Sequence, residues 1–153
     1  MPGKQTEVVL SPRGSRECRA ARPPCSPSAR HWPQPAEWSC LPALAWREVP
    51  GFLSGAAVTI VPSARETFGN LALESLSVGT PVVAHATGNL PDLIGPDAGI
   101  LVPPEAGPGG LLEVARELLA DAVRYHRACG AAYCRSRNYR SADVAEAFLK
   151  AVL

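Results

Sequence analysis

From about residue 46 onward, short apolar runs alternate with longer stretches in which apolar residues recur at helical spacing. Three of these runs, each bounded by proline or glycine, have the length and composition of buried strands: 58–61, 81–84 and 99–102. The remaining stretches predict a short helix or turn at 49–57 and helices at 69–78, 89–94, 111–120, 121–132 and 141–153. Strands that alternate with helices indicate βαβ units, so we expect an α/β fold with a parallel sheet. Three strands are few for a doubly wound domain, which suggests a fold without its first units.

The first 45 residues lack this pattern. Residues 1–50 hold nine of the sixteen prolines and all three tryptophans, and the stretch 19–30 has neither strand nor helix periodicity. Such a segment cannot bury enough apolar surface to offset its ordering entropy. We therefore expect residues 1–45 to be disordered or poorly packed, and residues 46–153 to form the folded unit.

Composition mainly excludes classes of function. A length of 153 residues allows one domain with a modest core. The net charge of +1 gives no electrostatic reason to expect nucleic acid as a partner. No apolar run approaches the ~20 residues that span a bilayer, and the N-terminus lacks a signal peptide, so the expected location is the cytoplasm. The cysteines form no CxxC pair, so no metal site is expected: Cys18, Cys25, Cys40, Cys129 and Cys134.

The candidate chemistry is concentrated in residues 63–87, where seven residues separate Glu66 from Glu74. Glu66 precedes a helix start at Gly69, and Glu74 lies one turn into that helix. A helix N-terminus offers unpaired N–H groups and a positive dipole end, which suit a phosphate, and a glycine there lets the ligand approach. A carboxylate about 6 Å further along the axis can accept two hydrogen bonds, which suits the paired hydroxyls of a ribose.

The faces of this helix support a role for its glutamate. One face is apolar and is expected to pack on the sheet: Ala72, Leu73 and Leu76. The opposite face carries two aliphatic residues beside the charge: Leu71, Glu74 and Val78. We infer that Glu74 points into a cleft or toward another protein surface. The alternative is a solvated helix former, which is the commoner state of a lone glutamate in a helix.

The joint pattern is more specific than either glutamate. A strand, Pro-Ser, Glu66, Phe-Gly-Asn, Glu74 and then Gly-Thr-Pro-Val-Val closely resemble glycosyltransferase family 4, the group 1 glycosyltransferases. Residues 88–94 and 99–103 also look like the continuation of this family, and the resemblance covers about 46–153. It implies a GT-B architecture, two Rossmann-like domains with the active site between them. This chain would be a truncated Rossmann-like parallel sheet with flanking helices, the C-terminal nucleotide-sugar-binding half.

The resemblance also implies roles for the residues of this segment. Glu66 would contact the donor sugar and serve catalysis with retention, and Glu74 would bind the nucleotide ribose. Backbone contacts to sugar and diphosphate would come from Thr67, Phe68, Gly69, Asn70 and Leu71. The donor would be a nucleoside-diphosphate sugar, with no metal or other cofactor. The acceptor-binding domain and the loop whose Arg and Lys neutralise the diphosphate are not found, so a separate domain or chain would complete the cleft.

Other interpretations stay open at this level. The chain could be a catalytically inactive remnant or an interaction module that keeps the Rossmann-like core. A different nucleotide or flavin binder would need a glycine-rich loop after its first strand, which 62–66 does not provide.

Further features carry weaker predictions. His85 ends a strand and is expected to be satisfied by backbone rather than by a ligand, and 103–110 is interpreted as a loop. A late group of arginines suggests contact with an anion or with a membrane surface, although such helices are usually just solvated: Arg124, Arg127, Arg135, Arg137 and Arg140.

Overall fold

The computed structural model describes residues 8–10 and 44–152. Its centre is a four-stranded sheet in the order β1 (Val8–Leu10), β2 (Val58–Val61), β3 (Val82–His85), β4 (Gly99–Val102). Strands β2, β3 and β4 run parallel, and β1 pairs with β2 in the antiparallel sense. The predicted α/β fold with a parallel sheet is confirmed.

The three parallel strands lie where the apolar runs predict them. Strands β2 and β3 are buried along their whole length, as expected for a parallel sheet covered on both faces. Strand β1 is an addition that the apolar pattern did not predict. It pairs Val9 with Thr59 and so occupies the outer edge of β2. Residues 1–7 and 11–43 lie outside the described residues, so their predicted disorder stays a prediction.

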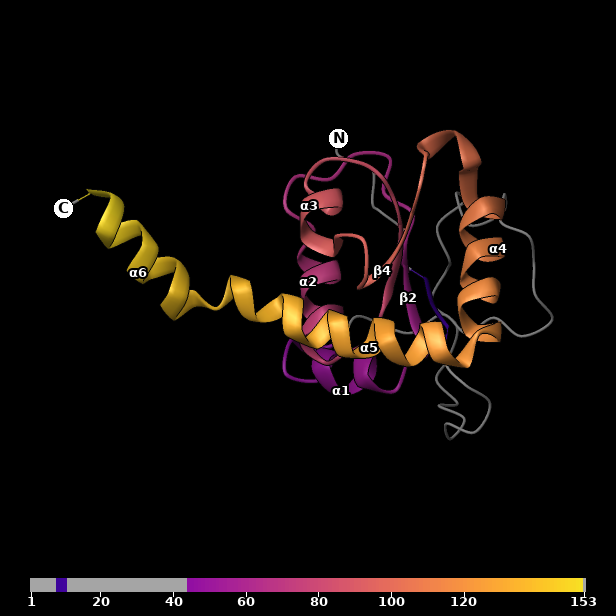
Figure 1. Ribbon diagram of the computed structural model, residues 1–153, viewed down its shortest axis with the longest axis horizontal. Helices are drawn as coiled ribbons and strands as arrows, with labels where there is room; N and C mark the ends of the chain where they lie inside the picture. The colour runs from indigo at the N-terminus through magenta and orange to yellow at the C-terminus, as the bar shows by residue number, and fades with distance from the viewer. Residues whose placement is uncertain (1–7, 11–43, 153) are drawn as a thin grey trace.

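Helices cover both faces of the sheet (Figure 1). Helices α1 (Val49–Ser54), α2 (Asn70–Ser77) and α3 (Leu90–Ile94) lie on one side, and α4 (Gly107–Ala120) lies on the other. Helix α5 (Ala122–Ser136) runs across the molecule, and α6 (Ser141–Val152) extends away from the body. Two short 3-10 helices precede α4 and α6, η2 (Pro104–Ala106) and η3 (Arg137–Tyr139). Within the described part of the chain, no helix is long and apolar enough to cross a membrane.

Two buried clusters pack against opposite faces of the sheet because strand side chains alternate between faces. Val82 and Ala84 point into the cluster beneath α2 and α3. Val83 points into the cluster beneath α4. Helix α5 contributes to both, with Ala132 in the first and Ala128 in the second. The crossing of α5 therefore joins the two layers.

The prediction of a loop over 103–110 is wrong in part. After η2, helix α4 begins at Gly107 and takes Pro108, Gly109 and Gly110 into its first turn. A proline is tolerated there because the N–H it lacks has no intrahelical acceptor. The glycines have a low helix propensity, but tertiary packing of the later turns of α4, where Leu111 and Leu118 are buried, stabilises the helix. Helix α5 also continues past its predicted end at 132, to Ser136.

Tyr125 ties α5 to the chain just before β2. Its half-buried hydroxyl donates a 2.9 Å hydrogen bond to the carbonyl oxygen of Ala57. Burial, and then the hydrogen bond and charge of Cys129, raise the pKa of the Tyr125 phenol above its ordinary value. Because folding favours the neutral phenol, this contribution to stability is complete below the ordinary pKa and is lost as pH rises through the raised one.

Replacing Tyr125 with phenylalanine should lower the free energy of unfolding at neutral pH by about 1 kcal/mol, because the Ala57 carbonyl loses its donor. As pH rises into the alkaline range, the wild type should lose this advantage and the two proteins should converge. Urea unfolding of both proteins across this pH range measures the difference. A difference that stays constant with pH would contradict the assignment.

Candidate functional site

Two loops meet at the carboxyl ends of β2 and β3, the edge of a parallel sheet where α/β proteins bind ligands. Thr87, after β3, donates a 3.1 Å hydrogen bond from its hydroxyl to the carbonyl oxygen of Ser63, after β2. Gly88 has a φ of 53°, and a Cβ there would lie 1.8 Å from the carbonyl oxygen of Glu66. Glycine is therefore the residue that allows the two loops to pack this closely.

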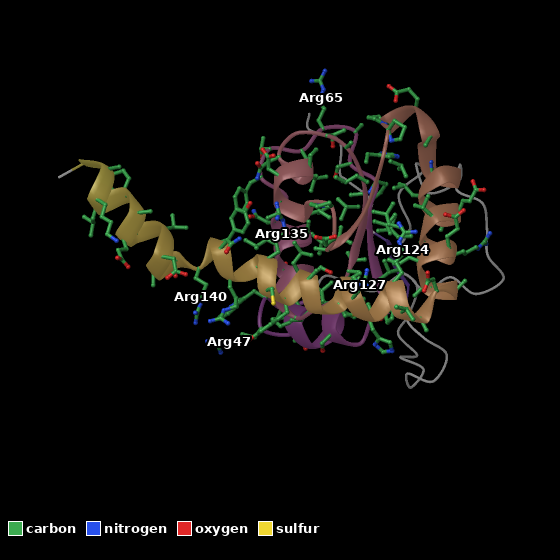
Figure 2. All side chains as sticks on the ribbon, viewed as in Figure 1. Arg47, Arg65, Arg124, Arg127, Arg135 and Arg140 are labelled. Carbon is green, nitrogen blue, oxygen red and sulfur yellow. The ribbon has the colours of Figure 1, made fainter. Side chains whose placement is uncertain are left out.

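The Glu66 carboxylate is positioned by its own loop. The Ser63 hydroxyl donates to Oε2 over 3.3 Å, and the Thr67 amide donates to Oε1 over 3.1 Å. The half-buried Glu66 borders an open hollow of about 610 Å³, which is lined by Ala64, Arg65, Glu66, Thr67, Thr87 and Gly88. Arg65 extends outward from this end of the molecule (Figure 2). The hollow thus presents a fixed carboxylate beside a cation.

The N-terminus of α2 lies in the same loop. Gly69 is its N-cap, with a φ of 89°, and no side chain caps the helix. The first bond of the helix runs from the Leu73 amide to the Gly69 carbonyl at 3.0 Å, so the amides of 70–72 have no intrahelical acceptor. A Cβ at Gly69 would lie 2.7 Å from the Leu90 side chain, which explains glycine at this cap. The helix therefore offers uncapped N–H donors at the edge of the sheet.

The structure brings only part of the predicted site together at the hollow. Glu66 and Thr67 line it. Phe68 is exposed and packs edge-to-face on Tyr139, with ring centroids 6.0 Å apart, and its carbonyl accepts a 3.5 Å hydrogen bond from Asn89. Asn70 is exposed at the helix start. These positions form one continuous loop and helix turn, but the roles assigned to them stay predictions.

The aliphatic neighbours of Glu74 on its helix face predicted that its side chain points into a cleft or toward another protein surface, and the structure explains these neighbours differently. Leu71 is half-buried and packs on the same core cluster as Leu73, and Val78 is also half-buried. The two aliphatic residues are thus explained by contacts inside the domain, and they give no reason to place Glu74 in a cleft. The Glu74 side chain is exposed and makes no hydrogen bond or ion pair with the described residues. It is not among the residues that line the hollow.

His85 is only partly satisfied by backbone. It is buried at the end of β3, and its Nε2 lies 3.5 Å from the Gly107 carbonyl oxygen, a long contact. Its Nδ1 is buried without a hydrogen-bond partner among the described residues. We expected the backbone to provide hydrogen-bond partners for this histidine at the end of its strand. The structure provides one only at Nε2, and that contact is long.

Four residues that line the hollow were not among the predicted site residues: Ala64, Arg65, Thr87 and Gly88. A signal for the last two existed, because they directly follow the strand next to β2 and so must lie at the same edge of a parallel sheet. Within 8–10 and 44–152, no group of three or more His, Cys, Asp or Glu side chains is arranged to hold a metal ion.

The fold and this site define the class of protein, an α/β domain with an uncapped helix N-terminus and a carboxylate at the edge of its sheet. The sequence profile of the family described as Glycosyl transferases group 1 matches residues 35–121. The chain belongs to this family, and the resemblance identified from the glutamate segment is confirmed.

Named relatives agree with this family. The chain is 32% identical over 102 residues to a 2-deoxystreptamine N-acetyl-D-glucosaminyltransferase of Streptomyces fradiae, covering 67% of this chain and 24% of the relative. It is 36% identical over 81 residues to a GDP-mannose-dependent alpha-(1-6)-phosphatidylinositol dimannoside mannosyltransferase of Mycobacterium tuberculosis, covering 53% and 21%. The chain therefore spans about a quarter or less of the length of these relatives.

Two solved structures share the fold. Sucrose-phosphate synthase of Thermosynechococcus elongatus aligns with a TM-score of 0.57 at 31% identity, over 65% of this chain and 26% of that one. The C-terminal domain of a glycosyl transferase group 1 family protein from Francisella tularensis aligns with a TM-score of 0.57 at 21% identity, over 65% and 51%. The fold is that of GT-B glycosyltransferase domains, in agreement with a partial C-terminal domain.

Proposed function

We propose that this chain carries the donor-binding part of a retaining glycosyltransferase that uses a nucleoside-diphosphate sugar. The diphosphate lies on the uncapped amides at the start of α2, Glu66 accepts hydrogen bonds from the transferred sugar, and Glu74 accepts them from the ribose. Thr67 to Leu71 supply backbone contacts between these two ends. The acceptor is bound by a separate domain or chain, and transfer requires both parts.

The observation that carries the proposal is the start of α2, where Gly69 leaves three amides without an acceptor beside a held Glu66 carboxylate. Amides and the positive end of a helix stabilise a phosphate without a metal ion. Glu66 already receives two hydrogen bonds, which orient its carboxylate and leave lone pairs for sugar hydroxyls. Membership of the glycosyltransferase family supplies the reaction class.

The test is an amide-resolved NMR titration of the full chain with UDP, GDP and ADP. The expected result is a saturable shift of the amides of 69–72 by one nucleotide more than by the others, which would also identify the base. Amide shifts confined to residues far from α2 would overturn the proposed site. A folded spectrum unchanged by all three nucleotides would favour a module that keeps the fold without donor binding.

A further inference from the structure

A second hollow, of about 460 Å³, lies between α2 and the segment that connects α5 to α6. Its lining includes Ser77, Tyr133, Ser136, Arg137, Tyr139 and Arg140. Figure 2 shows Arg140 at the junction of α5 and α6, away from the loop that carries Arg65. This hollow is therefore distinct from the one that Glu66 borders, and none of the residues predicted to bind the donor lines it.

The two arginines of this hollow differ from their neighbour Arg135. The Arg135 side chain has a structural role, because its guanidinium donates hydrogen bonds to the carbonyl oxygens of Leu93 at 2.7 Å and of Asp92. Among the described residues, no carboxylate lies within 4.0 Å of the Arg137 or Arg140 guanidinium, and neither makes a side-chain hydrogen bond. Both are thus exposed cations whose hydrogen-bonding capacity is unused.

The surroundings of these guanidiniums favour an anion. The hydroxyl of Tyr133 makes no hydrogen bond with the described residues, so it is available as a donor. Tyr139 is held by the edge-to-face contact with Phe68 and presents a half-buried ring at the same hollow. No acidic side chain is among the lining residues, so the local charge is positive.

A second pair of arginines, which lies on α5, provides a contrast. Arg124 and Arg127 also line a hollow, of about 390 Å³, but Asp97 and Asp121 line it with them. Two carboxylates offset the two guanidiniums there, so that hollow has no net positive charge. The difference between the two hollows lies in the carboxylates and not in the number of arginines.

We propose that the hollow formed by Arg137, Arg140 and Tyr133 binds a phosphate group. Guanidinium groups bind phosphate through paired, charge-assisted hydrogen bonds, and two of them at one hollow can bind the same phosphate from two sides. The phosphate belongs either to a free phosphorylated metabolite or to a phospholipid headgroup, since both present the same chemistry.

An NMR titration of the full chain with inorganic phosphate and then with glycerol 3-phosphate tests the site. We expect saturable shifts at the amides of Ser77, Tyr133 and Arg137. The double variant Arg137→Gln/Arg140→Gln should weaken binding by about tenfold or more, because charge-assisted hydrogen bonds are lost. Both side chains are exposed, so the variant should fold. A second variant, Arg137→Lys/Arg140→Lys, keeps the charge, and it should still bind more weakly because the paired geometry is gone.

The matched control is Arg124→Gln/Arg127→Gln, which changes the net charge equally. Its affinity for glycerol 3-phosphate should equal that of the wild type. Equal weakening in both double variants, shifts without saturation, or shifts centred on the start of α2 would each overturn the proposal.

Cosedimentation with phosphatidylcholine vesicles, with and without phosphatidylinositol, distinguishes a phospholipid headgroup from a free phosphorylated metabolite as the source of the phosphate. Binding to the anionic vesicles that depends on Arg137 and Arg140 supports a headgroup, and glycerol 3-phosphate binding without it supports a free metabolite.

Discussion

Replacing Gly88 with alanine is expected to separate the two loops that form the candidate site and to destabilise the protein. The new Cβ would lie 1.8 Å from the carbonyl oxygen of Glu66, so backbone must move. The φ of 53° adds a further penalty, because L-residues are disfavoured in the left-handed region. Together the conformational penalty and the overpacking should cost about 2–5 kcal/mol.

Urea unfolding measures this cost, and the amide shifts of residues 63–67 report whether the Glu66 loop has moved. The matched control is Gly130→Ala in α5, where a Cβ meets nothing within 4 Å and φ is not positive. That change should leave stability equal or raise it by about 0.5–1 kcal/mol, because alanine is the better helix former. A Gly88→Ala protein as stable as the wild type, with unchanged shifts at 63–67, would contradict the close packing of the Gly88 and Glu66 loops.

Replacing Glu74 with alanine is expected to weaken binding of the preferred nucleoside diphosphate by roughly 10- to 100-fold, if Glu74 accepts from the ribose. The side chain is exposed and makes no contact that the fold needs, so stability should change by less than about 0.5 kcal/mol. Loss of affinity without loss of stability is what separates a ligand contact from a structural one. Isothermal titration calorimetry and urea unfolding on the same samples give both quantities.

The control for Glu74 is Glu113→Ala, which removes the same charge from an exposed position on α4, on the other face of the sheet. Its nucleotide affinity should match that of the wild type. Glu74→Gln keeps the length of the side chain but removes the charge, so an intermediate affinity would indicate charge-assisted acceptance from hydroxyls. Equal affinities of the Glu74→Ala and Glu113→Ala proteins would show that Glu74 does not contact the nucleotide.

The site was predictable where it depends on local sequence. Gly69 predicts a helix start, and the structure has it as the N-cap of α2. The inference about Glu74 was not supported, because the burial of Leu71 and Val78 depends on elements elsewhere in the chain. Thr87 and Gly88 directly follow a predicted strand, so their edge of the sheet was predictable, but their contact with the Glu66 loop was not. Their proximity to the Glu66 loop depends on the pairing of β2 with β3.

The sequence by itself determined the order of the parallel strands and helices, because apolar periodicity and glycine or proline boundaries act over a few residues. It also determined the family, because the two glutamates and the helix start between them are contiguous in sequence. Only the tertiary structure decided that α4 begins at Gly107 and that β1 pairs at the edge of β2. It alone brought Arg137 and Arg140 to one hollow beside α2. These features depend on packing between distant segments, which local pattern does not encode.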